Sequence, residues 1–452
     1  MIPILLLIAA LSAPPQDTSR LTITAAIDRA LATHPAVAAA RASVDAATAE
    51  MGQARAAWRP AVSLDGNVSR FEKPMVVYPL HALDLRNPPL FDTELSQVSL
   101  GAAYTLFDFG ARSAKVKAAT SQRDAATASL DASQQQLAVR TVSAYLRVLT
   151  ARGVLVAEDQ RMAALASEAT RARDRLAAGK AARVDTLRAA AELASAAADR
   201  VSSAANVDVA EHDLARLIGA PYESVRGIAL DAVRLTGDGA ARAATARAGD
   251  ESPARAALVD MANRSNADVQ AALRRADAAG ASVGAAKATR LPQLQATTAV
   301  VDRSNLTGRY LAEWQVGLGL SWPLYTGGAR ESAIGRAEAA SHVAQEQVRL
   351  ARLTAEQQLD DARASFDAAR ARTAALEAAV GQAAEVARIT QLARDVGEGT
   401  QTDYLLAESS LFRARSNLVQ ARHAAIAARV ELARVTGELS RSWIATSLES
   451  QP

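Results

Sequence analysis

Apolar and polar residues alternate along four short segments of the chain. The clearest segment runs from Trp314 to Leu324, where almost every second residue is large and apolar. The same alternation is found over residues 62–68, 98–106 and 294–300. A period of two places one set of side chains on each face of a β-strand. The pattern therefore predicts two pairs of strands, each with an apolar stripe opposite small or polar residues.

Longer stretches without proline are typical of helices. Residues 111–177 and 329–395 contain no proline, and a helix of about 67 residues extends roughly 100 Å at 1.5 Å per residue. Each stretch is followed by a glycine-containing turn and a second helical stretch that ends near Gly219 or Gly437. Glycine suits the residue just beyond a helix C-terminus. We therefore expect two long helical hairpins.

The second half of the chain repeats the first. Pro60, which stops the helix before the first strand pair, corresponds to Pro292, 232 positions later. Further on, Leu106–Arg112 corresponds to Leu324–Arg330, 218 positions later. The two offsets differ by 14 residues, which places an insertion in the first half around residues 73–89. The chain is therefore predicted to be an internal duplication.

The chain begins with a short apolar run. Residues 1–13 end in small side chains and are too few to span a bilayer as a helix, which is typical of a secretory signal peptide. The cleavage point stays open, because the run lacks a basic residue and is followed by Pro14. The predicted organisation is a signal peptide (1–13), a first repeat (21–219), an equatorial linker (220–252), a second repeat (253–437) and a C-terminal tail (438–452).

The apolar stripes favour contact with lipid. Trp314 and Trp322 lie eight residues apart on one stripe, a rise of roughly 26 Å, or about 20 Å at a tilt near 40°. This length approaches the apolar band between the aromatic girdles of outer-membrane barrels. With Tyr104 on the stripe of another strand, the two tryptophans form the predicted membrane girdle. For any single strand, a soluble sheet with one buried face is the alternative.

The number of strands predicts an oligomer. An open sheet edge cannot sit in lipid, because its backbone groups have no partner there. Four strands cannot close a barrel, and eight are the usual minimum. Strands from several copies must therefore combine, and three copies would supply twelve strands.

Composition supports long helices and excludes several kinds of site. Half of the residues are apolar but only 4% are aromatic, which suits closely packed helices. Leu130, Leu137 and Ala144 recur at heptad spacing, as in a coiled-coil seam. The chain has no cysteine, and its five histidines show no ligand-pair spacing, so we expect no metal site. It has no nucleophile elbow, phosphate loop or paired-carboxylate signature in context, so we expect no catalytic or cofactor site. The net charge of +3 comes from arginines interspersed with acidic residues, which does not favour nucleic-acid binding.

Three motifs stand out along the chain: Thr141–Leu149, Phe107–Gly110 and the spacing of Gly179, Asp185 and Leu187. Together they resemble TolC-like outer membrane efflux proteins, and the resemblance runs from about residue 21 to 439. It implies a mainly α-helical homotrimer, with a twelve-stranded transmembrane β-barrel continued by a periplasmic α-helical barrel. Such a protein is an exit duct in the cell outer membrane. It conducts substrates passively for a tripartite efflux pump or a type I secretion system, with a periplasmic adaptor and an inner-membrane transporter as partners.

The resemblance also implies site residues. The turns that face the adaptor correspond to Ala178, Gly179 and Lys180 and to Val396, Gly397 and Glu398; reversal of the chain is their alternative role. Some members carry acidic residues at the tunnel entrance, where this chain has Arg388 and Gln391 with Asp395 nearby. Cation selectivity at the entrance therefore stays open. A periplasmic adaptor, which also has a helical hairpin, is the alternative function, although it does not explain the duplicated strand pairs.

Overall fold

The computed structural model describes residues 20–77, 86, 91–180, 182–236, 251–305 and 310–451. The predicted signal peptide lies outside these residues, as do most of residues 78–90 in the predicted insertion and residues 237–250 of the predicted linker. The chain divides into two compact units. Of the described residues, the first unit holds those within 1–40, 130–267 and 352–452, and the second holds those within 41–129 and 268–351.

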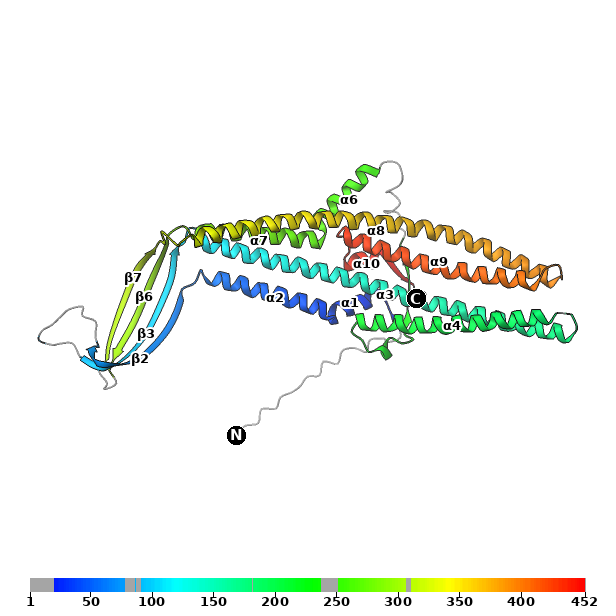
Figure 1. Cartoon of the computed structure of the whole chain (residues 1–452), viewed down its shortest axis with the longest axis horizontal. Helices are drawn as coiled ribbons and strands as arrows, with labels where there is room; N and C mark the ends of the chain where they lie inside the picture. Colours follow the sequence, from blue (N-terminus) through cyan, green and yellow to red (C-terminus); the bar gives the residue numbers. More distant parts are fainter. Residues whose placement is uncertain are drawn as a thin grey trace, which may run out of the picture. The chain divides into compact units, whose positions relative to one another are not determined.

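The second unit contains a four-stranded antiparallel sheet (Figure 1). Its strands are β2 (Ala61–Val76), β3 (Phe91–Phe107), β6 (Gln293–Ser304) and β7 (Tyr310–Ser321), in the order β2-β3-β6-β7. The alternation of apolar residues predicted all four strands. The two strand pairs, far apart in sequence, join through β3 and β6, where Leu100 lies opposite Val300.

The predicted stripe on the last strand was too long. β7 ends at Ser321, so Trp322 and Leu324 lie beyond it. The reason is Pro323, which has no N–H for a sheet hydrogen bond and restricts the backbone of the residue before it. The Trp322 indole N–H instead donates to the Arg290 carbonyl oxygen at 3.1 Å.

Matching helices occur in the two halves of the chain. α3 (Ala111–Ala177) and α8 (Ala329–Asp395) each have 67 residues, and α4 (Arg183–Leu217) and α9 (Gln401–Val435) each have 35. The helices before the strands, α2 (Pro35–Ala56) and α7 (Ala267–Ala288), each have 22. The predicted long hairpins are therefore present. No helix among the described residues is long and apolar enough to cross a membrane.

Glycine ends both return helices, as predicted. Gly219 follows α4 with a φ of 63°, and Gly437 follows α9 with a φ of 76°. A Cβ at Gly219 would lie 2.6 Å from the Thr33 hydroxyl oxygen, and one at Gly437 would lie 2.5 Å from the Ser265 carbonyl oxygen. Both positions therefore require glycine for its left-handed backbone and for the close approach of a neighbouring segment.

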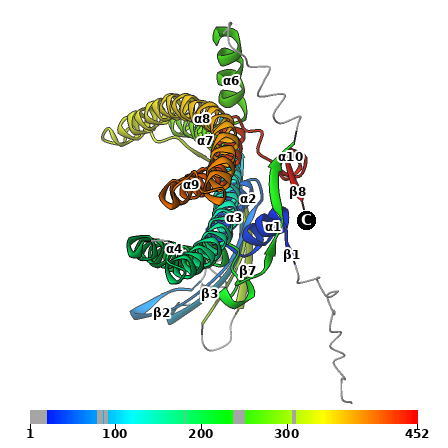
Figure 2. The same cartoon turned by 90° about the vertical axis from the view of Figure 1, so that its right-hand side faces the viewer.

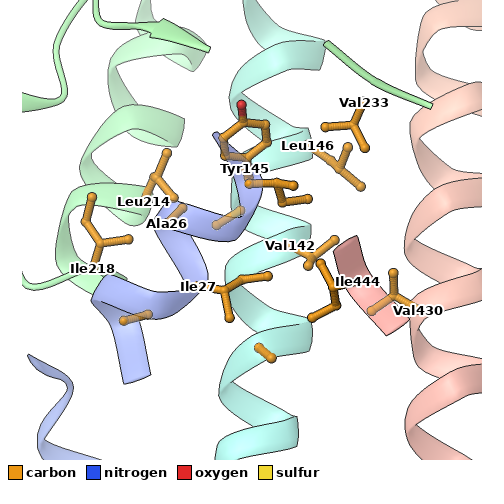
Figure 3. Packing of buried hydrophobic residues seen from close by; sticks show 14 of the residues in the cluster. Ala26, Ile27, Val142, Tyr145, Leu146, Leu214, Ile218, Val233, Val430 and Ile444 are labelled. Carbon is orange, nitrogen blue, oxygen red and sulfur yellow. The ribbon is translucent and has the colours of Figure 1, made fainter. Parts of the chain in front are cut away.

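The largest apolar core lies in the first unit, around α3. Tyr145 is fully buried there, and its hydroxyl donates toward the carbonyl oxygens of Leu21 and Asp231, at 2.7 and 3.0 Å. Burial raises the pKa of Tyr145 strongly, so its hydroxyl stays a donor. Figure 3 shows side chains converging on α3 from α1 (Ile23–Thr33), α4, α9, α10 (Arg441–Ser447) and β5 (Ala232–Leu235). The predicted seam residues Leu137 and Ala144 are buried in this cluster.

The segments outside the hairpins pair with one another. β1 (Arg20–Leu21) runs parallel to β4 (Ala229–Leu230), and β5 pairs antiparallel with β8 (Leu448–Gln451). The predicted linker and the predicted tail are therefore held together in the first unit. The short helix η1 (Tyr222–Ser224) follows α4, and α6 (Glu251–Ser265) precedes α7 and packs on α8 through Leu258 and Leu359.

Candidate functional site: the hairpin turns and the strand surface

The first hairpin turn closes the end of α3. Gly179 has a φ of 71°, and the backbone N–H groups of Gly179 and Lys180 donate to the carbonyl oxygens of Leu176 (2.9 Å) and Arg175 (2.8 Å). This pair of bonds is the Schellman arrangement, which satisfies carbonyls that the helix end leaves free. Apart from its two chain neighbours, no described residue has an atom within 4 Å of a Cβ built at Gly179. The turn is therefore an open tip.

The second hairpin turn has the same construction. Gly397 has a φ of 86°, and the N–H groups of Gly397 and Glu398 donate to the carbonyl oxygens of Arg394 (3.1 Å) and Ala393 (2.9 Å). α9 then begins at a Thr400 cap, whose hydroxyl accepts from the Asp403 N–H at 3.1 Å. Space is open around Gly397 as well. Both sets of predicted turn residues therefore lie at exposed helix reversals in the first unit.

A buried ion pair joins the two hairpins near these turns. The Arg394 guanidinium donates to the Glu168 carboxylate at 2.8 Å, and both side chains are about 5% exposed. Arg171 donates to the same carboxylate at 2.7 Å, and the Arg394 guanidinium lies 4.0 Å from the centre of the Tyr404 ring. The cluster ties α3 to α8 and α9. It was not predicted, since neither residue stands out in sequence among the many charged residues of the helices.

The predicted entrance residues lie on the last turns of α8. Arg388 is exposed and donates to Glu385 at 2.8 and 2.9 Å; this hydrogen bond raises the pKa of Arg388 and lowers that of Glu385. Gln391 is exposed. Asp395 is exposed too, and accepts from the buried Arg394 at 2.8 Å. Arg388 is thus paired on its own helix, and Asp395, the one acidic residue of the three, is exposed but paired with Arg394.

The four-stranded sheet carries large apolar residues that no part of the described chain covers. Trp314 on β7 is 77% exposed, and the residues that share its stripe are similarly exposed: Val316, Leu318 and Leu320. On β2, at the opposite edge, Val62, Leu64 and Val68 are exposed as well. An uncovered apolar surface of this extent marks an interface with lipid or protein. Of the other predicted girdle residues, Trp322 is exposed and Tyr104 is half-buried.

Arginines hold the junctions between strands and helices. At the first junction, Asp108 caps α3 by accepting from the N–H and the Nε of Arg112, both at 2.9 Å. The Arg112 guanidinium also lies 4.2 Å from the centre of the Trp58 ring and 5.7 Å from that of the Tyr104 ring. At the second junction, the Arg330 Nε donates to the Thr326 hydroxyl at 3.4 Å. These contacts give both arginines of the repeated motif a role in shaping the junction.

The helices of the first unit pack in pairs. α3 packs on α4 through Ala169 and Ala189, and α8 packs on α9 through Ala387 and Ala407. α9 also lies beside α3 (Figure 2). The His423 ring nitrogen of α9 is 2.6 Å from the Thr150 hydroxyl of α3. Burial lowers the pKa of His423, so the ring is neutral near pH 7. Among the described residues, no group of three or more acidic, His or Cys side chains could hold a metal ion.

The mainly helical chain, with two long hairpins and a four-stranded antiparallel sheet, has the fold of several solved outer membrane proteins. Among solved structures, the outer membrane protein VceC of Vibrio cholerae matches with a TM-score of 0.75 at 23% identity, over 92% of this chain and 96% of VceC. The Campylobacter jejuni outer membrane channel CmeC also has a TM-score of 0.75, at 16% identity over 93% of this chain and 86% of CmeC. These likenesses show the fold.

Sequence comparison supplies the family. The profile of the outer membrane efflux proteins matches residues 26–220 and 258–438. The outer membrane efflux protein BepC of Brucella suis is 28% identical over 429 residues, which are 93% of this chain and 86% of BepC. This chain belongs to the outer membrane efflux protein family. Its place is the outer membrane, with a large periplasmic portion.

Proposed function

We propose that this chain is one protomer of a homotrimeric exit duct, which conducts substrates passively from the periplasm to the exterior. The observation that carries the proposal is the four-stranded sheet, whose edge strands β2 and β7 expose apolar residues and lack a further strand partner among the described residues. Lipid offers no hydrogen-bond partners, so the backbone groups at a sheet edge must pair with another strand. Edge-to-edge pairing of three copies supplies them and gives a closed barrel of twelve strands, with Trp314 and Trp322 in its aromatic girdle.

In this proposal, each protomer consists of two copies of one structural unit, residues 21–219 and residues 253–437. The equal lengths of α3 and α8, of α4 and α9, and of α2 and α7 support it. Six similar hairpins in a trimer then form the wall of a helical tunnel. Residues 220–252 and the tail after residue 437 form an equatorial belt, a role that the pairing of β5 with β8 supports.

The hairpin turns are the proposed contact with a periplasmic adaptor, which connects the duct to an inner-membrane transporter. Open space around Gly179 and Gly397 supports this role, because a partner can reach both turns without moving other side chains. Arg388, Gln391 and Asp395 are the proposed lining of the tunnel entrance. The chain serves a tripartite efflux pump or a type I secretion system, and the genes beside its own distinguish the two.

The alternative function, a periplasmic adaptor, is not favoured, because the outer membrane efflux profile covers most of the chain. Cell fractionation and electrophoresis of unheated samples separate the two functions. The duct predicts an outer-membrane protein that needs detergent and migrates as a trimer until it is heated. A soluble periplasmic monomer would overturn the proposal.

Docking at the turns is tested by a double variant, Gly179→Trp with Gly397→Trp. Bulky side chains at both tips should leave the trimer intact and abolish export, because they block contact with the adaptor. Gly227→Trp is the matched control, since Gly227 is an exposed glycine with a φ of 67° and open space around it, but lies away from the hairpin ends. Export that is unchanged in the double variant would refute the docking role.

A further inference from the structure

The two hairpin tips have the same backbone but opposite charge. Residues 171–188 around the first turn hold six basic and two acidic residues, a formal charge of +4. The equivalent residues 389–406 around the second turn hold one basic and three acidic residues, a formal charge of −2. Lys180 and Glu398, each directly after the turn glycine, occupy equivalent positions 218 residues apart. The side chain directly after each turn glycine therefore carries the same sign as the net charge of its own tip.

The positive charge of the first tip faces solvent. Four of its basic side chains are exposed and form no ion pair with another described residue: Arg173, Arg175, Lys180 and Arg183. Arg171 is held by Glu168, and Arg188 donates to the Thr402 hydroxyl at 3.3 Å. Asp185 is partly covered, where its carboxylate accepts from the N–H of Ala182. The potential near this turn is therefore positive.

The negative charge of the second tip is equally accessible. Asp395, Glu398 and Asp403 are exposed, whereas the one basic residue, Arg394, is buried and already bound to Glu168 and Asp395. At about 0.15 M salt, screening acts over roughly 8 Å. The charges within one or two helical turns of Gly397 thus set the potential that an approaching partner meets.

We propose that the first tip docks on an acidic surface of the periplasmic partner and the second tip on a basic one. The inference rests on the proposed docking function and adds the chemistry of the contact. In a trimer, three positive and three negative tips alternate around the ring, so the partner presents both signs of charge around its rim. Like charges brought together at such a contact are repulsive, so the alternation also fixes which part of the rim meets which hairpin.

The charge difference is measured without any partner. Because the chain has no cysteine, a single cysteine in place of Ala178 or Val396 labels one tip of the full-length protein with a fluorophore. Iodide should quench the label at residue 178 about twofold more efficiently than the label at 396, and a cationic quencher should show the reverse, since surface potentials concentrate counter-ions. Neutral acrylamide corrects for exposure. Equal ratios at both tips would overturn the proposal.

The charge of the partner surface at each tip is determined by cross-linking in the native host, from a photoreactive side chain at residue 178 or 396. The proposal expects residue 178 to cross-link to acidic segments of the partner and residue 396 to basic ones. Cross-links to segments of the same charge would overturn the charge assignment and leave the docking role standing. An absence of cross-links to any partner from both turns would overturn the docking role itself.

A rival role for the charges is attraction between the tips. The exchange variant Lys180→Glu with Glu398→Lys distinguishes this role from docking on the partner. It keeps opposite charges at the two positions but reverses the sign of the charge that each tip presents to the partner. Lys180→Glu alone should weaken partner binding roughly two- to fivefold, as expected for an exposed ion pair. The exchange variant should bind the partner at least as weakly as Lys180→Glu, and the loss of affinity in both variants should vanish near 1 M salt. Restored binding in the exchange variant would overturn the proposal.

Discussion

The two strand-to-helix junctions place the same arginine in different surroundings. Arg112 is buried against the carboxylate of Asp108, which is 5% exposed, and donates to the Ala57 carbonyl oxygen at 3.4 Å. Arg330 donates to the equivalent carbonyl oxygen, that of Thr289, at 3.3 Å, but its side-chain partner is the neutral hydroxyl of Thr326. Both junctions therefore share the hydrogen bond from the arginine to a backbone carbonyl oxygen. Only the first junction adds a buried ion pair, Arg112 with Asp108.

The two junctions also differ in which residues adopt a left-handed backbone. Phe109 and Gly110 both have positive φ angles at the first junction, and Gly327 and Gly328 do so at the second. A left-handed conformation costs roughly 1–2 kcal/mol for a residue with a Cβ. The Phe109 ring lies edge-on to the Phe107 ring, with ring centres 4.6 Å apart. The first junction thus combines a buried ion pair with one non-glycine residue in the left-handed region, whereas the second has glycine at both left-handed positions.

The largest effect is expected for Arg112→Met. The substitution leaves the Asp108 carboxylate buried without its counter-charge, and such a change costs about 3–5 kcal/mol. Chemical unfolding of the detergent-solubilised protein, followed by tryptophan fluorescence, measures the loss. The double variant Asp108→Asn with Arg112→Met should recover part of it, because asparagine still caps α3 but carries no charge. A double variant as unstable as Arg112→Met would contradict this explanation.

A smaller effect is expected for the matched change at the second junction, Arg330→Met. Thr326 is neutral and keeps access to water, so no buried charge is left behind. Losing the hydrogen bonds of the partly exposed Arg330 should cost about 1 kcal/mol. The same unfolding measurement applies. A loss equal to that of Arg112→Met would show that the shared hydrogen bond to the backbone, and not the ion pair, dominates both junctions.

These contrasts also show which features of the structure the sequence predicts. Period-two alternation predicted the four strands, and the absence of proline predicted α3 and α8, because both signals arise locally. Turn glycines predicted the hairpin ends for the same reason. Even so, the alternation extended past Ser321 in sequence while the strand did not, since the stripe continues across Pro323 and the sheet hydrogen bonds cannot.

Contacts between distant segments were beyond prediction. Glu168 and Arg394 are 226 residues apart, and each looks like an ordinary solvated charge on its own helix. β5 and β8 are only four residues long, which is too short for a periodic signal. The repeated arginine motif was visible as a repeat, but its partners were not, because Ala57 and Trp58 come from the turn between α2 and β2, far from Arg112 in sequence. Sequence thus located the hairpin turns and missed the cluster that ties them together.

The smallest effect, and the only gain, is expected for Thr326→Asp, which gives the second junction the carboxylate of the first. By analogy with Asp108, the new side chain should accept from the Arg330 guanidinium and from N–H groups at the start of α8. A negative charge at a helix N-terminus stabilises it by about 0.3–1 kcal/mol at an exposed site.

The Thr326→Asp gain should fall as salt is added, because the junction is partly open to solvent. Thr326→Asn is the matched control, since asparagine offers the same capping geometry without charge. A gain of equal size in both variants, insensitive to salt, would assign the effect to capping alone. A loss in Thr326→Asp would mean that the second junction cannot adopt the geometry of the first, and that its glycines, more than its missing carboxylate, distinguish the two halves.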